Sequence, residues 1–179
     1  MTERFKWVLW QEAEPGLLDR DLKEVPRFAS GLSYVAPEVD DCGEVLHHGK
    51  WVGTVPVWPF ERGAPANIDQ LVPEGVEIEL VYSAAHPMVP PRIYVTDPEP
   101  LLQERGPNTW HVAPGGSLCL LQTDGGWTPE SPITDLIAKA AGWRIEYALM
   151  KAGAIEQMTL CGIVSDPLLD AVITEVANR

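Results

Sequence analysis

The sequence has few basic residues, few cysteines and no long hydrophobic run. Its 13 lysines and arginines stand against 26 aspartates and glutamates, so the formal net charge is −13 at pH 7. This balance argues against nucleic acid as the main partner, because phosphate groups attract basic surfaces. No run approaches the ~20 apolar residues of a membrane span, and the start, MTERFKWVLW, lacks the apolar core of a signal peptide. We therefore expect neither a nucleic acid nor a membrane as partner.

The cysteines also limit the kind of protein this can be. Cys42, Cys119 and Cys161 are widely spaced and odd in number, which favours thiols in a reducing, cytoplasmic compartment over a disulfide framework. Cys42 with His47 and His48 gives part of a zinc motif, but a structural zinc site needs four ligands and no second pair lies nearby. Glycine-rich phosphate-binding motifs are missing, so any adenylation would come from a partner. We expect no metal and no other cofactor.

Length and hydrophobic content suit one folded domain. The 179 residues, 45% of them hydrophobic, are enough for a proper core. The sequence shows no internal repeat and no low-complexity linker. We therefore predict a single domain over residues 1–179, with most of the seven tryptophans in its core.

Three stretches predict an antiparallel meander of strands. Residues 76–82 alternate strictly, with apolar side chains on one face and glutamates on the other. Residues 51–58 alternate less strictly, and Pro56 favours an edge position. Residues 92–95 form the next short strand, and residues 5–10, short and aromatic, also suit a strand.

Helices are predicted near both ends of the chain. Residues 17–25 have apolar positions that share one face, and Pro26 is expected to end this helix. Residues 166–177 form a last helix, with Asp166 as a possible N-cap. Cys161, in a mostly apolar segment, is expected in the core.

A longer helix is predicted from about residue 131 to 152. Pro132 suits its first turn and Gly153 its end. Apolar residues recur at 3.6-residue spacing, at Ile133, Leu136, Ile137, Ala140, Ala141, Ile145 and Ala148. Strands followed by helices predict an α+β fold, with helices against one antiparallel sheet.

The most informative stretch is residues 111–129, HVAPGGSLCLLQTDGGWTP. It places Cys119 in a short apolar run between two glycine-rich turns, with Trp127 and Pro129 following eight and ten residues later. A thiol held near backbone turns at a surface can be a nucleophile. The alternative is a buried structural cysteine, a common environment for this residue.

These motifs resemble the active site of ubiquitin-conjugating enzymes. The matching pieces are Leu118-Cys119-Leu120, Trp127-Thr128-Pro129 and the upstream segment 86–91, HPMVPP. The resemblance covers roughly residues 50–152, whereas residues 1–45 are divergent. With these differences the chain looks like the divergent bacterial members found in anti-phage defence operons. It implies the UBC-like fold: an antiparallel meander with flanking helices and a catalytic cysteine loop.

The resemblance also implies a reaction and its partners. Cys119 would accept a ubiquitin-like protein from an activating-enzyme homologue as a thioester and pass it to a lysine of a target protein. Family members dock the activating enzyme through the first helix, here residues 17–25, whose mixed charges predict a dedicated partner. His111 stands where the family has an asparagine. It can donate to the oxyanion, act as a base, or only bond to backbone.

Other residues of the motif are expected to support the loop. Trp127 and Pro129 would order it, and Gly116 would form the preceding turn. Asp124 can orient or desolvate an attacking lysine, or simply make the turn, which we favour. His86 is expected to be structural. The three prolines that follow it are expected to shape a rigid turn without doing chemistry, namely Pro87, Pro90 and Pro91.

Two alternative functions stay open. The first is a binding module that keeps the scaffold but performs no catalysis, which the missing asparagine allows. The second is a cysteine hydrolase that uses Cys119 and a histidine, although such enzymes usually place the base on a separate element.

Overall fold

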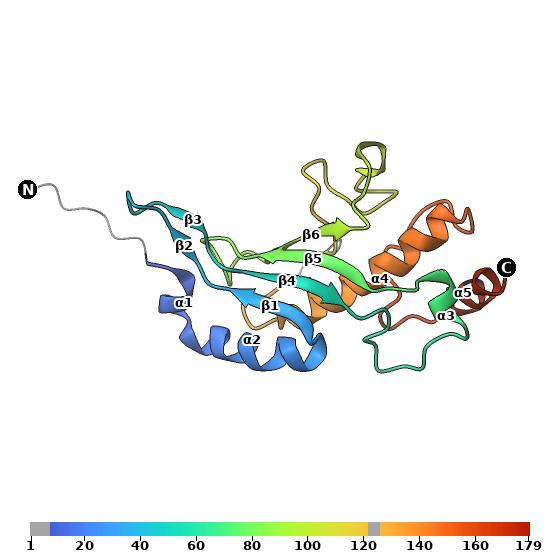
Figure 1. Cartoon of the computed structure of the whole chain (residues 1–179), viewed down its shortest axis with the longest axis horizontal. Helices are drawn as coiled ribbons and strands as arrows, with labels where there is room; N and C mark the ends of the chain where they lie inside the picture. The colour runs from blue at the N-terminus through green and yellow to red at the C-terminus, as the bar shows by residue number, and fades with distance from the viewer. Residues whose placement is uncertain (1–7, 122–125) are drawn as a thin grey trace, which may run out of the picture.

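The computed structural model describes residues 8–121 and 126–179 and has an α+β architecture (Figure 1). A four-stranded antiparallel sheet has the order β1-β4-β5-β6, with bounds Gly31–Val35, Lys50–Val55, Val76–Val81 and Arg92–Asp97. Strands β2 and β3 pair separately, at Glu38–Val39 and Val45–His47. Helices α1 to α5 span Trp10–Ala13, Pro15–Phe28, Ile68–Leu71, Ile133–Lys151 and Asp170–Ala177. A 3-10 helix spans Leu102–Glu104.

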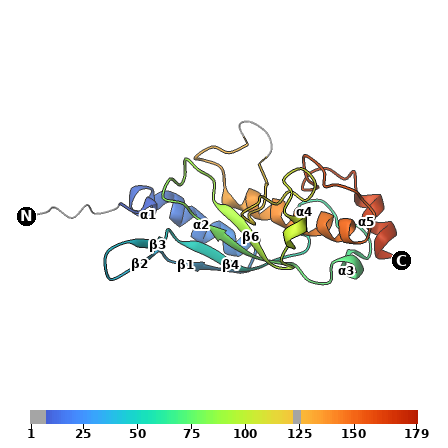
Figure 2. The ribbon, with the colours of Figure 1, turned by 90° about the horizontal axis from the view of Figure 1, so that it is seen from above.

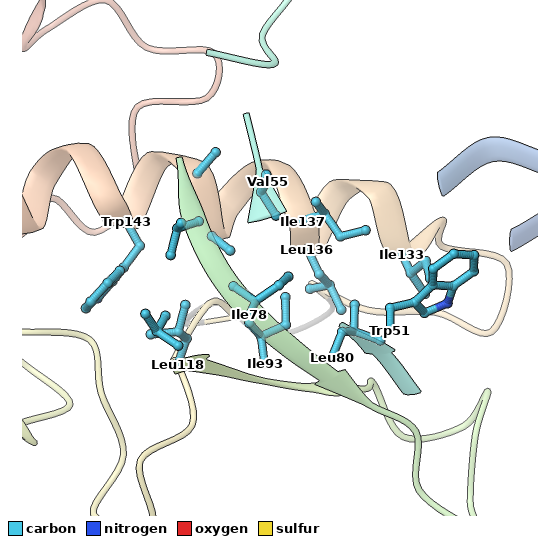
Figure 3. Close-up of a cluster of buried hydrophobic side chains, with 14 of the residues drawn as sticks. Trp51, Val55, Ile78, Leu80, Ile93, Leu118, Ile133, Leu136, Ile137 and Trp143 are labelled. Atoms are coloured by element: carbon cyan, nitrogen blue, oxygen red, sulfur yellow. The ribbon is translucent and has the colours of Figure 1, made fainter. Parts of the chain in front are cut away.

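The predicted meander is confirmed as β4-β5-β6, and β5 shows why it forms. Val76, Ile78 and Leu80 are buried on one face of β5, while Glu77 on the other face is exposed. The buried face meets α4, and Figure 3 shows side chains of the strands and of α4 pointing toward one another. Strict alternation in the sequence therefore reflects a sheet with one face against the core.

Helix α4 confirms the long predicted helix, and all seven residues of its apolar stripe are buried. The helix contacts β4 and β5 as well as α2, and α2 and α4 lie along the same side of the sheet in Figure 2. Its end follows the expected glycine rule. Gly153 has φ +68°, and the Ala154 N–H donates to the Leu149 carbonyl at 2.9 Å.

The sheet has one more strand than predicted, and the expectation for Pro56 is wrong. Strand β1 was not predicted, and it pairs with β4. As a result β4 lies between β1 and β5 and is not an edge strand. Because β4 ends at Val55, Pro56 lies just beyond the ladder and its missing N–H costs no strand hydrogen bond.

Near the N-terminus the structure corrects the predicted strand over residues 5–10. Residues 5–7 lie outside the described part of the chain, and Trp10 begins α1. Tertiary contacts decide this conformation. The Trp10 Nε1–H donates to the His48 carbonyl at 2.8 Å, and its ring centroid lies 4.6 Å from that of Tyr82.

Two helix boundaries also differ from the prediction. Helix α2 continues through Pro26 to Phe28, because a proline in the last turn removes only one helical hydrogen bond. Helix α5 begins at Asp170, four residues later than expected. Asp166 instead accepts a hydrogen bond from the Leu168 N–H in the preceding turn, at 2.9 Å. Within the described ranges, no helix is long and apolar enough to span a membrane.

A buried polar chain ties α2 to the sheet. The Tyr82 hydroxyl donates to Asp21 Oδ2 at 2.8 Å and accepts from Trp51 Nε1–H at 3.0 Å. Arg20 bonds the other oxygen of Asp21 at 3.1 Å and donates to the Glu130 carbonyl at 2.9 Å. Arg20 and Asp21 belong to the helix that is predicted to dock an activating enzyme. Their charged groups thus form contacts within the protein itself.

We expect Tyr82→Phe to destabilise the protein by about 1–3 kcal/mol. The substitution keeps the ring but leaves a buried carboxylate oxygen and an indole N–H without their shared partner. The measurement is the free energy of unfolding in urea. Tyr34→Phe, which removes a half-buried hydroxyl that accepts one bond from Gln11 at 3.3 Å, is the control and is expected to cost less. Equal losses in the two variants would contradict this account.

Candidate active site

Cys119 is the last residue of a small hairpin whose tip is the predicted glycine turn. Val112 and Leu118 pair across it as an antiparallel bridge. At the tip, the Ala113 carbonyl accepts from the Gly116 N–H, and the Ala113 N–H donates to the Ser117 carbonyl, both at 2.8 Å. Gly116 has φ +89°, a conformation that glycine adopts without strain. The turn therefore requires the glycine that the sequence supplies.

The hairpin is attached to the edge of the sheet. Ser117 forms a bridge with Tyr94 of β6, and the Leu118 N–H donates to the Ile93 carbonyl at 2.8 Å. The next N–H, that of Cys119, donates back across the hairpin to the His111 carbonyl at 2.7 Å. The cysteine is thus the first residue beyond the bonds to β6, fixed by backbone contacts at the sheet edge.

Cys119 and His111 line one pocket of about 190 Å³. The Cys119 side chain is half-buried, and this burial raises the pKa of its thiol. A smaller fraction is therefore thiolate at neutral pH than for an exposed cysteine. The remaining wall of the pocket is formed by Leu120, Lys139, Trp143, Glu146, Met158 and residues 160–164.

His111 is buried beside the cysteine in an unusual backbone conformation. It is 8% exposed and has φ +50°. Its Nε2 has no hydrogen-bond partner among the described residues. Burial lowers the pKa of the imidazole, which is therefore neutral at pH 7. A neutral ring at this place can donate or accept one hydrogen bond from a molecule in the pocket.

The segment after the cysteine is held where it rejoins the core. The Trp127 Nε1–H donates to the Pro87 carbonyl at 2.8 Å, which links the Trp-x-Pro motif to the proline-rich turn. Pro129 is half-buried, and Arg20 bonds the backbone just beyond it at Glu130. Asp124 lies outside the described residues.

The proline-rich turn packs as a structural unit behind the site. Pro91 is buried, Pro87 and Pro90 are half-buried, and the His86–Pro87 peptide bond is cis. The His86 ring is 4% exposed, and its centroid lies 4.5 Å from that of Trp10. His86 thus packs among the aromatic rings of the core.

His86 is expected to make stability depend on pH. Burial, with a smaller effect of the Arg20 charge, lowers the pKa of His86 to about 4. An unfolded histidine has a pKa of about 6.5. Between these values the unfolded state binds more protons. The contribution of His86 to the free energy of unfolding is therefore fully present above pH ~6.5, where the ring is neutral in both states. It is lost as the pH falls toward 4, because the unfolded state takes up a proton first.

The test compares the wild type with His86→Phe, which keeps a ring but does not titrate. From about pH 7.5 to about pH 4, the free energy of unfolding of the wild type is expected to fall by about 3 kcal/mol more than that of the variant. Other groups, such as Asp21 and Glu146, are common to both proteins and cancel in the difference. Parallel stability curves would refute the assignment.

Three polar residues of the pocket were not expected there from the sequence. Cys161 is exposed, so the expectation of a core position is wrong. Glu146 of α4 is buried and accepts hydrogen bonds from the N–H and the hydroxyl of Thr159, at 2.6 and 2.9 Å. Lys139 of α4 donates to the Leu120 carbonyl at 3.1 Å. In the sequence, Lys139 differs from its neighbours as a charged residue inside a largely apolar helix, and this contrast could have indicated a role.

The partial zinc motif is not assembled into a metal site. Cys42 is exposed in the β2–β3 turn, and its N–H donates to Asp40. His47 Nδ1 accepts from the Gly49 N–H at 3.2 Å. Across residues 8–121 and 126–179, no group of three or more His, Cys, Asp or Glu side chains is placed to hold a metal.

Comparison with known proteins adds no identification: no protein-family model matches the chain, and no curated protein matches it.

Proposed function

We propose that this protein is a ubiquitin-conjugating-like enzyme with a UBC-like fold. In this proposal Cys119 accepts a ubiquitin-like protein from a separate activating enzyme and transfers it to an amine of a target protein. The observation that carries the proposal is the pocket at the sheet edge where Cys119 and His111 meet. The order of motifs around this pocket is the second support.

The chemistry assigns a step to each residue. The Cys119 thiolate attacks the carbonyl of the activating enzyme's thioester, a new C–S bond forms, and the activating enzyme's thiolate leaves. The exchange is nearly balanced in energy, so positioning matters more than a strongly acidic thiol. This requirement agrees with a thiol that is fixed by backbone bonds although burial raises its pKa.

His111 acts in the second step. An amine of the target attacks the Cys119 thioester, and a tetrahedral oxyanion forms before the thiolate leaves. The proton that the amine loses passes to the departing thiolate or to solvent. The neutral imidazole of His111 donates a hydrogen bond to this oxyanion, the role of the family's asparagine. Its buried Nε2, which has no partner among the described residues, is available for this bond.

The partners follow from the resemblance and the charge of the chain. The proposal requires an activating-enzyme homologue and a ubiquitin-like protein, and it places the reaction in bacterial antiviral defence in the cytoplasm. With a net charge of −13, the chain favours a partner that presents a basic face. The exposed charges of α2 that remain for docking are Asp19, Lys23 and Arg27.

A direct experiment separates the proposal from its alternatives. The protein is incubated with the activating-enzyme homologue, ATP and the ubiquitin-like protein, and then analysed on a non-reducing gel. A band that thiol reagents remove supports conjugation. Complete absence of an adduct, with binding of the ubiquitin-like protein retained, supports a non-catalytic binding module. Release of the ubiquitin-like protein from a peptide-linked substrate without ATP supports a cysteine hydrolase.

A further inference from the structure

Three consecutive residues around the cysteine each take part in a hydrogen bond through a backbone group. The Leu118 N–H donates to Ile93 of β6, and the Cys119 N–H donates to His111 across the hairpin. The Leu120 carbonyl accepts from the Lys139 ammonium of α4. The first two bonds join backbone to backbone, so the Lys139 bond is the one of these three that a side-chain substitution can remove.

The environment of Lys139 differs from that of a solvated surface lysine. It is half-buried on α4, between the buried Ala138 and Ala140, and it lines the pocket together with Cys119. A long side chain with a charged end loses considerable rotamer entropy when ordered. A charged donor to a carbonyl is among the stronger hydrogen bonds in proteins and can offset that loss.

We propose that Lys139 is a positioning residue for Cys119. By holding the Leu120 carbonyl, its ammonium fixes the Leu120–Leu121 peptide, one residue beyond the cysteine, and keeps the thiol half-buried at the pocket. This inference rests on the proposed function for its effect on acyl transfer, because a misplaced nucleophile slows that step. Its effect on the thiol itself does not depend on the reaction.

The two effects have opposite signs, which makes the proposal testable. Without the bond, the backbone after Cys119 gains freedom and the thiol gains access to water. Alkylation of Cys119 by iodoacetamide should then become faster, by about tenfold, the factor that one charged hydrogen bond typically contributes. Transfer of the ubiquitin-like protein should become slower, by about tenfold to a hundredfold, with little change in KM.

The variants are Lys139→Met, which keeps the length of the side chain but removes the ammonium, and Lys139→Arg, which restores a charged donor. The matched control is Lys151→Met on the same helix. Lys151 bonds Glu104 at 2.5 Å and does not line the pocket. Alkylation is followed at the Cys119 peptide by mass spectrometry. Lys139→Gln serves as a second variant if Lys139→Met does not fold.

The proposal predicts faster alkylation and slower transfer in Lys139→Met, recovery of both in Lys139→Arg, and neither change in Lys151→Met. Unchanged alkylation in Lys139→Met and Lys139→Gln would overturn it, and so would an equal change in Lys151→Met. If the wild type forms no thioester, the proposed function fails while the alkylation rates still decide the role of Lys139.

Discussion

Cys119→Ala is expected to abolish thioester formation, whereas Cys42→Ala and Cys161→Ala should retain it. The nucleophile must lie in the pocket at the sheet edge and be fixed by its neighbours, and Cys119 meets both conditions. Alanine keeps the backbone N–H that bonds His111, so the hairpin should survive the substitution. Cys119→Ser is expected to give a more stable oxyester or no adduct, because a hydroxyl is a far weaker nucleophile at neutral pH.

The control with most information is Cys161→Ala. Cys161 lines the same pocket as Cys119 and is exposed, so proximity alone would make it a rival nucleophile. Cys42, in the distant β2–β3 turn, tests a different part of the surface. The measurement is the thiol-sensitive band on a non-reducing gel. Charging that persists in Cys119→Ala and disappears in either of the other variants would show that the wrong thiol has been assigned.

Loss of the His111 side chain is expected to leave charging largely intact and to slow discharge onto lysine by about a hundredfold or more. One well-placed donor to an oxyanion contributes roughly 2.7–4 kcal/mol. Charging needs only a thiolate and an activated carbonyl presented by the partner. The measurement is the rate at which preformed thioester disappears when free lysine is added.

The backbone at His111 determines which substitutions are informative. With φ +50°, a residue with a Cβ at this position, histidine or alanine, carries strain of about 1–2 kcal/mol. His111→Gly removes the side chain without that strain and is therefore the better deletion. His111→Asn keeps a donor, and asparagine tolerates the left-handed region well. We expect Asn to recover part of the discharge rate that Gly loses. Normal discharge by His111→Gly would return this residue to a purely structural role.

The parts of the fold that local patterns encode were predictable. The alternation of β5 and the apolar stripe of α4 reflect single buried faces, and both elements were predicted with nearly correct bounds. Strand β1 was missed because its sequence, GLSYV, shows little alternation and is defined by pairing with β4. The aromatic surroundings of Trp10 predict a strand, whereas the structure begins α1 there, with Trp10 in contact with His48 and Tyr82.

The candidate site also has parts that local sequence patterns predict and parts that depend on tertiary contacts. The cysteine, the glycine turn and the histidine lie within one hairpin, so their closeness follows from local spacing. The contact between Lys139 and Leu120 requires α4 to dock beside the hairpin. Nothing local in the sequence specifies this docking. The apolar neighbours of Cys161 predict a core position, yet the residue belongs to a C-terminal segment that lies against α4 and leaves the thiol at the surface.

The bonds that hold residues 118–120 also set an order for folding. The bond across the hairpin closes a short loop, the bond to β6 closes a longer one, and the bond to α4 requires a helix that follows in the sequence. During synthesis the chain emerges N-terminus first, so β6 and the hairpin are made before α4. The hairpin can therefore assemble on the growing sheet before α4 exists. We therefore expect a nascent chain to present the Cys119 thiol to its surroundings until the long helix has been made and docked.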